Sequence, residues 1–74
     1  MSAEFLDATG LLCPLPVLKA RKRLAALAAG DVLTVHADDP GAKRDMAALC
    51  QTQGHRLLSA RQEGNLLIFE IRKG

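Results

Sequence analysis

Two prolines around one leucine, Pro14-Leu15-Pro16, are the feature that most restricts how this chain can fold. Proline fixes φ and lacks an N–H, so the stretch can lie neither inside a strand nor deep inside a helix. Proline is tolerated in the first turn of a helix, and it steers the residue before it toward extended backbone. We therefore expect Cys13 at the N-cap of a helix whose first residue is Pro14. Gly10 is expected to end the strand that precedes this junction.

Alternation of apolar and polar residues predicts four strands, over residues 3–8, 32–37, 56–62 and 66–72. A turn at Glu63-Gly64-Asn65 would join the last two strands into a hairpin. In the final strand Leu67, Phe69 and Ile71 fall on one side, because successive side chains of a strand point to opposite faces. These three residues are predicted to face the core.

Apolar residues at three- and four-residue spacing predict two amphipathic helices, over residues 14–29 and 40–53. Gly30 and Gly54 stand where each helix should end. Asp39 could cap the second helix, with Pro40 at its first position.

The order βαβαββ predicts an α+β fold: a two-layer α/β sandwich in which a four-stranded mixed sheet carries two helices on one face. A β-helix-β connection is right-handed in nearly all proteins, so the first two strands should be parallel and both helices should cover the same face. The chain has 74 residues and no linker or repeat, which predicts a single domain over residues 1–74.

Composition argues against several classes of partner. Ten basic and eight acidic residues give a net charge of only +2, and no Trp or Tyr is present to stack on bases, so direct nucleic-acid binding is not expected. No apolar run approaches the ~20 residues of a membrane span. With two cysteines and no signal-peptide pattern at the start, we expect the reducing cytoplasm.

Cys13 is the residue with the clearest chemical potential. Residues that cap helices usually offer an oxygen, so a sulfur at this place is not explained by helix stability. The positive end of a helix dipole favours thiolate, and cysteine pKa values in such settings fall to roughly 3.5 to 7.5. Because Pro14 and Pro16 lack N–H groups, Leu15 is the only donor in the first turn that could reach the sulfur. The sequence predicts a rigidly presented, activated thiol.

The first predicted helix is strongly basic. It carries four cations and no acidic residue: Lys19, Arg21, Lys22 and Arg23. This face is either a docking surface for an acidic partner or a solvated helix face, and Lys19 would add some stabilisation of the thiolate. Among the leucines around Cys13, we expect Leu12 to pack on Val17 as a hydrophobic staple. Leu11 and Leu15 are expected to form an apolar rim that a partner covers.

The remaining candidate ligands do not form a motif. Cys50 shares an apolar stripe with Met46 and Leu49, so we expect it in the core. His36 and His55 lack the short spacing of a zinc site, and no C-x-x-C or Gly-rich phosphate loop is present. We expect no metal and no cofactor.

A set of these residues is similar to a known family. Asp7-x-x-Gly10-x-x-Cys13-Pro14-x-Pro16, followed by Gly30, Asp38-Asp39-Pro40, Asp45, Cys50 and Gly54-His55, resembles the TusA/SirA-like sulfur carriers over residues 5–72. The resemblance implies a βαβαββ fold like that of the C-terminal domain of translation initiation factor three. It also implies that Cys13 carries sulfane sulfur as a persulfide.

The resemblance further implies the partners. A cysteine desulfurase or rhodanese-type protein would donate the sulfur, and a downstream acceptor would take it for tRNA thiolation, molybdenum-cofactor assembly or sulfur oxidation. A lone nucleophile without a base or acid fits a carrier that acts with partner enzymes rather than a stand-alone catalyst. Two alternatives stay open: a nucleic-acid-binding or regulatory module that uses the basic helix, and a redox sensor that pairs Cys13 with Cys50.

Overall fold

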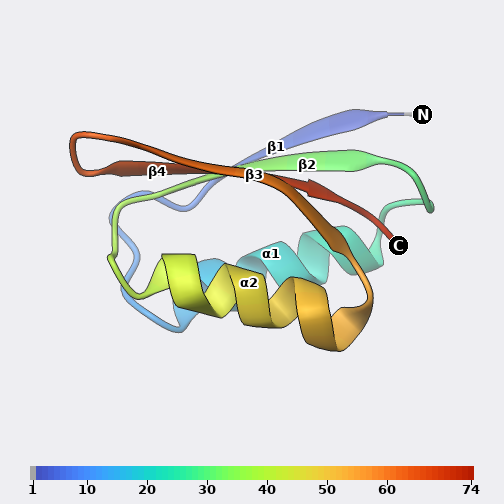
Figure 1. The fold of residues 1–74 in the computed structure, drawn as a ribbon, viewed down its shortest axis with the longest axis horizontal. Coiled ribbons are helices and arrows are strands. Elements are labelled where there is room, and N and C mark those ends of the chain that lie inside the picture. The colour runs from blue at the N-terminus through green and yellow to red at the C-terminus, as the bar shows by residue number, and fades with distance from the viewer. Residues whose placement is uncertain (1) are drawn as a thin grey trace.

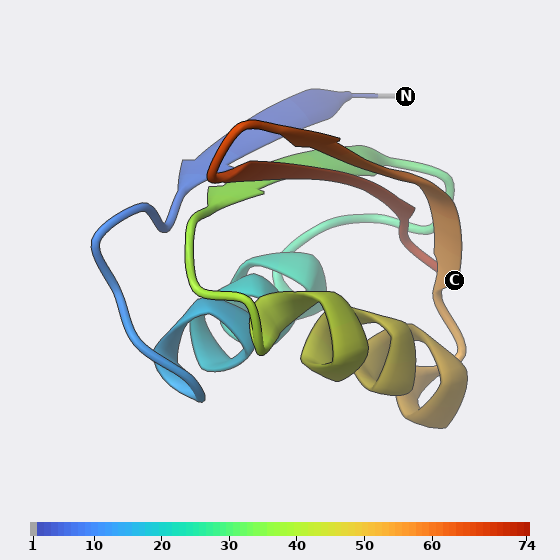
Figure 2. The same ribbon diagram turned by 60° about the vertical axis from the view of Figure 1, so that its left-hand side comes forward.

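Two helices lie beneath one curved, four-stranded sheet (Figure 1). The computed structural model describes residues 2–74. Its elements are β1 (Ala3–Asp7), α1 (Leu15–Ala25), β2 (Val32–Ala37), α2 (Ala42–Gln53), β3 (Arg56–Glu63) and β4 (Leu66–Arg72). Both helices cover the same face of the sheet, as the rotated view in Figure 2 also shows. The predicted α+β fold and the predicted order of elements are confirmed.

The strand order in the sheet is β1-β2-β4-β3. Strand β1 runs parallel to β2, with Leu6 beside Val35, and this confirms the predicted parallel pairing of the first two strands. Strand β4 pairs antiparallel with both β2 and β3 and places Phe69 beside Val35. Strands β2 and β4 therefore lie at the centre of the sheet and β1 and β3 at its two sides, and the carboxyl ends of the parallel strands β1 and β2 lie at the same edge.

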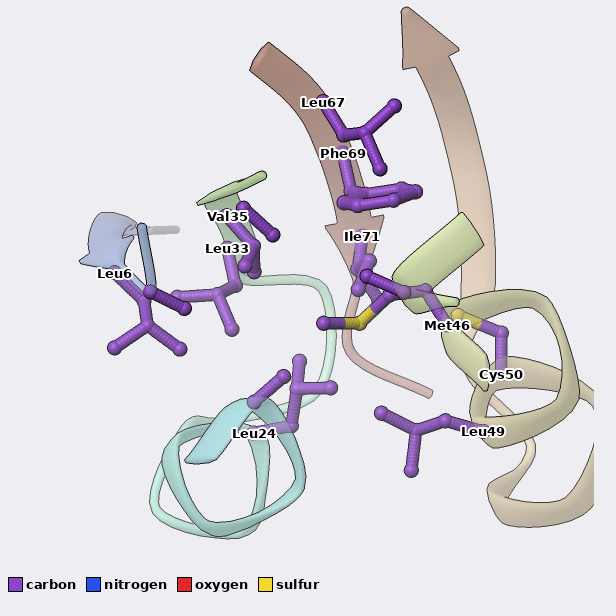
Figure 3. Packing of buried hydrophobic residues seen from close by; sticks show 14 residues of the cluster. Leu6, Leu24, Leu33, Val35, Met46, Leu49, Cys50, Leu67, Phe69 and Ile71 are labelled. Atoms are coloured by element: carbon purple, nitrogen blue, oxygen red, sulfur yellow. The ribbon is translucent and has the colours of Figure 1, made fainter. Parts of the chain in front are cut away.

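The core lies between the sheet and the helices (Figure 3). Leu67, Phe69 and Ile71 are all buried and point toward the helices, so the predicted inward row of β4 is confirmed. The helices contribute fewer large side chains, chiefly Leu24 from α1 and Met46 from α2, each with no exposed surface. Neither helix, within residues 2–74, is long and apolar enough to cross a membrane.

Helix α1 begins one residue later than predicted. Pro14 is the N-cap, with φ −98° and ψ 16°, so Cys13 lies outside the cap and Pro16 takes the second helical position. The Cys13–Pro14 peptide bond is cis. The Leu15 N–H donates to the carbonyl of Leu12 at 2.9 Å and closes a tight turn before the helix. That bond occupies the N–H expected to reach the sulfur.

Helix α1 also ends earlier than predicted, at Ala25 rather than just before Gly30. The Lys73 ammonium, which follows β4, donates to the carbonyl of Leu24 at 2.6 Å and to that of Leu27 at 3.1 Å. A cation from the far end of the chain thus satisfies carbonyls at the helix terminus. The spacing of apolar residues along the helix does not reveal this long-range contact. The predicted helix therefore extended past Ala25.

Helix α2 begins at Ala42, two residues after the predicted start at Pro40. Gly41 is the N-cap, and no side chain among residues 2–74 caps the helix. The Asp39 carboxylate instead accepts the Gly41 N–H at 3.2 Å, which makes a turn just before the helix. Gly54 ends the helix as predicted, with φ 75°.

Candidate functional site around Cys13

The site forms where two loops meet at one edge of the sheet. Because β1 and β2 are parallel, the loop after β1, which carries Cys13, lies beside the loop after β2 (Figure 2). The Gly10 N–H donates to both carboxylate oxygens of Asp38, at 3.0 Å each. Gly10 has φ 80°, a conformation that suits glycine, so the residue both turns the chain and ties the two loops together.

Cys13 is exposed, as predicted, and its thiol has a partner that the sequence did not indicate. The Sγ–H donates to Oδ2 of Asp45, in the first turn of α2, at a Sγ–Oδ2 distance of 2.7 Å. The sulfur also rests close to the backbone of Gly41. A Cβ on residue 41 would lie 3.7 Å from Cys13 Sγ and 3.0 Å from Oδ2 of Asp39. Two carboxylates therefore lie near the thiol, on the side that faces α2.

The predicted lowering of the thiol pKa is wrong for this structure. Hydrogen bonding to Asp45 is the largest of several causes that raise the pKa of Cys13; the others are loss of solvent and the charges of Asp45 and Asp39. Arg44 acts in the opposite direction, and it is this cation, not the predicted Lys19, that favours the thiolate. Because the first turn of α1 has no free N–H group for the sulfur, the contacts with α2 determine whether the Cys13 thiol is protonated.

An open hollow of about 370 Å³ lies next to the thiol, between the two helices. Its lining includes Cys13 from the loop before α1, Leu18 and Arg21 from α1, and Asp45 and Thr52 from α2. Arg21 is the member of the predicted basic cluster that borders it. The site is thus a sulfur at one end of a shallow, partly apolar depression.

The other basic residues of α1 lie elsewhere. Lys19, Lys22 and Arg23 line a separate hollow together with Leu6. Arg23 is already engaged, since its Nη2 lies 3.3 Å from Glu4 Oε1 and donates to the Phe5 carbonyl at 3.1 Å. The structure therefore splits the predicted docking cluster into two surfaces.

The leucines near Cys13 differ from the prediction as well. Leu12 is 71% exposed, so it makes no hydrophobic staple with Val17. Leu11, expected at the rim, is partly buried and packs on the core. Leu15 and Leu18 are 47% and 51% exposed. The turn closed between Leu12 and Leu15 leaves the Leu12 side chain in solvent. Near the N-terminal end of α1, the exposed leucines are therefore Leu12, Leu15 and Leu18.

Cys50 lies in the core, as predicted. It is 4% exposed and packs among buried residues between α2 and the sheet (Figure 3). Burial raises the pKa of its thiol. A redox pair with Cys13 would require this buried sulfur to become accessible. Within residues 2–74, no group of three or more His, Cys, Asp and Glu side chains is placed to hold a metal ion.

Sequence reasoning did not find the roles of Asp45, Asp38 and Gly41 at the site. A usable signal was present, because two parallel strands joined by a helix must end at the same edge of the sheet. That rule brings the loop with Asp38 and Asp39 next to the loop with Cys13. It does not by itself reach Asp45, whose position depends on where α2 begins.

The comparison with known proteins agrees with this geometry. The family model described as Sulfurtransferase TusA matches residues 4–73. The chain belongs to the TusA family of sulfur carriers. The resemblance to the TusA/SirA-like family is confirmed.

Individual TusA-family relatives resemble the chain over nearly all of its length. The putative sulfur carrier protein YrkI of Bacillus subtilis is 45% identical over 73 residues, which are 99% of this chain and 97% of YrkI. The sulfur carrier protein TusA of Allochromatium vinosum is 46% identical over 68 residues, 92% of this chain and 90% of that protein. The crystal structure of a SirA-like protein from Desulfitobacterium hafniense matches with a TM-score of 0.85 at 29% identity, covering 96% of this chain and 97% of the other. The chain is therefore a sulfur carrier with the TusA/SirA-like fold.

Proposed function

We propose that Cys13 is the sulfur-carrying residue and that it holds sulfane sulfur as a persulfide. The observation that carries the proposal is the contrast between the two cysteines: Cys13 is exposed beside an open hollow, whereas Cys50 is buried in the core. A sulfur that passes between two proteins must be accessible to both, and Cys13 satisfies this condition. Gly10, Pro14 and Pro16 would support the loop that presents it.

Loading would proceed by exchange at sulfur. The Cys13 thiol loses its proton, and Sγ attacks the terminal sulfur of a persulfide on the donor. A new bond forms between Sγ and that sulfur, the sulfur–sulfur bond of the donor breaks, and the donor cysteine leaves as a thiolate that takes up a proton. In the second step a thiolate of the acceptor attacks the terminal sulfur and Cys13 leaves as a thiolate. No external oxidant or reductant is consumed.

The proposed partners are a cysteine desulfurase or rhodanese-type donor and a downstream acceptor protein, working in the cytoplasm. The acceptor would serve tRNA thiolation, molybdenum-cofactor assembly or sulfur oxidation. Two unpaired thiols suit a reducing compartment.

Docking would use the exposed apolar side chains around the thiol together with Arg21. Leu12, Leu15 and Leu18 give a partner apolar surface to cover, and Arg21 at the rim of the hollow favours an acidic group on that partner. Further along α1, Lys19, Lys22 and Arg23 would contact an acidic region of the partner protein. Leu11, half-buried against the core, would support the loop from beneath.

A relay assay tests the function. The protein is incubated with a cysteine desulfurase and sulfur-labelled cysteine, separated from the donor, and then mixed with an acceptor thiol. Labelled sulfur should move onto the protein and then onto the acceptor, Cys13→Ser should abolish both steps, and Cys50→Ala should retain them. Loading that persists in Cys13→Ser would contradict the proposal. RNA binding that weakens with salt and ignores Cys13 would favour the nucleic-acid alternative instead.

A further inference from the structure

We propose that Asp45 is a positioning residue that holds Cys13 as a protonated thiol turned toward α2, and thereby restrains its attack on sulfane sulfur in the unbound carrier. The proposal rests on the proposed role of Cys13 as the sulfur carrier. It assigns to a residue of α2, far from Cys13 in the chain, control over the reactivity of the carrier sulfur.

The geometry of the contact is the first support. The thiol donates to Oδ2 of Asp45 with the two heavy atoms 2.7 Å apart, and the contact joins residues that are 32 positions apart in sequence. Asp45 lies in the first turn of α2 and is partly buried, so the helix fixes its position. A carboxylate in this place accepts a proton-bearing sulfur but cannot donate a hydrogen bond to a thiolate.

The second support is the charge of Asp45. Among residues 2–74, no basic side chain lies within ion-pairing distance of its carboxylate; the ion pairs present are Arg23 with Glu4 and Arg61 with Glu63. The negative charge therefore acts on the adjacent sulfur without a neutralising partner. A thiolate formed here would be repelled by a like charge at contact distance.

The remaining charged groups around the sulfur do not reverse this balance. Asp39, on the loop before α2, adds a second negative charge on the same side. Arg44 on α2 opposes both carboxylates, and Arg21 borders the hollow from α1. Their sum raises the pKa of the Cys13 thiol.

A carrier whose thiol is held protonated has a less reactive sulfur while no partner is bound. The thiolate is the form that attacks persulfides, and it is also the form that alkylating agents and oxidants attack. Holding the sulfur protonated protects it when no donor is present. Neutralising Asp45 should therefore make Cys13 more reactive toward both kinds of reagent.

The test is the pH profile of Cys13 alkylation by iodoacetamide, followed by peptide mass spectrometry in the full chain. Asp45→Asn keeps the size of the side chain and removes its charge, so the profile should move to lower pH and the rate at pH 7 should rise by roughly fivefold or more. Asp45→Glu, which keeps the charge, should stay close to the wild type. Glu63→Gln, which removes a carboxylate on β3, should leave the profile unchanged. An Asp45→Asn profile that is unmoved or moves to higher pH, in a variant with wild-type circular dichroism, would overturn the proposal.

A second measurement uses glutathione persulfide as the sulfur donor. Sγ of Cys13 attacks its terminal sulfur, and glutathione leaves as a thiolate, so the products are Cys13 persulfide and glutathione. Asp45→Asn should load faster than the wild type at pH 7; slower loading would overturn the restraining role. If neither protein acquires sulfur on Cys13, the proposed function fails, while the alkylation profile still decides the role of Asp45.

Discussion

At the scale of single residues, the two cysteines differ in exposure to solvent, and the pKa of each thiol is raised. The pKa of Cys13 is raised mainly by the Asp45 carboxylate, and the pKa of Cys50 is raised by burial. Neither thiol is activated by its surroundings in the unbound protein. Exposure of Cys13 and burial of Cys50 therefore support the proposed carrier role of Cys13, and activation of its thiol would have to come from a change in the groups around the sulfur.

The raised pKa of Cys50 predicts a pH dependence of stability. Since its folded-state pKa lies above the unfolded value of about 8.5, its contribution is fully present below that pH and is lost as the pH rises. Urea denaturation of Cys13→Ser should give a lower free energy of unfolding at pH 10 than at pH 7. The same drop should be smaller in Cys13→Ser/Cys50→Ala, and equal drops in the two proteins would contradict the assignment.

At the scale of elements, the C-terminal end of α1 depends on a residue beyond β4. The Lys73 ammonium contacts the carbonyls of Leu24 and Leu27, where it also meets the negative end of the helix dipole. Lys73→Ala should lower the free energy of unfolding by about 1 kcal/mol, measured by urea denaturation. Lys43→Ala, which removes an exposed lysine of α2 without such contacts, should change it by less than about 0.5 kcal/mol. Equal effects of the two substitutions would show that Lys73 does not cap the helix.

At the scale of the whole molecule, one aromatic side chain holds the two layers together. Phe69 is fully buried at the centre of the core (Figure 3). Phe69→Ala should cost about 3 to 5 kcal/mol, a large share of the roughly 4 to 11 kcal/mol expected for a domain of this size. Urea denaturation should show a much lower midpoint or a protein already unfolded.

Phe5 provides the matched control for this prediction. It is 52% exposed on the opposite face of the sheet, where its ring meets His36 edge-on with centroids 4.8 Å apart. Phe5→Ala should cost no more than about 1.5 kcal/mol. A loss as large as that of Phe69→Ala would mean that the core does not lie where the structure places it.

The fold was predictable from the sequence because most of its elements carry local signals. The alternation that ends in Leu67, Phe69 and Ile71 identifies β4 and its inward face, and Gly54 marks the end of α2. The ends of α1 were missed because they depend on contacts outside the helix. The Leu15 N–H bonds to Leu12, and Lys73 reaches Leu24 from the far end of the chain.

The site was predictable only in part. Cys13 stands out because it directly precedes the Pro14-Leu15-Pro16 stretch, at a place where helix stability does not explain a cysteine. Its protonation was predicted with the wrong sign, because the deciding carboxylate of Asp45 is 32 positions away and is brought near by the packing of α2. The sequence pattern of one segment can identify a reactive residue, whereas the charges that set the pKa of that residue depend on the tertiary structure.

The measurement that most directly tests the central claim is the location of the sulfur after loading. The protein is loaded with sulfane sulfur by a cysteine desulfurase, alkylated, digested and analysed by peptide mass spectrometry. The Cys13 peptide is expected to gain the mass of one sulfur atom, and the Cys50 peptide is expected to gain none. Sulfur on the Cys50 peptide, or a Cys13 peptide that gains none while the chain as a whole does, would contradict the claim.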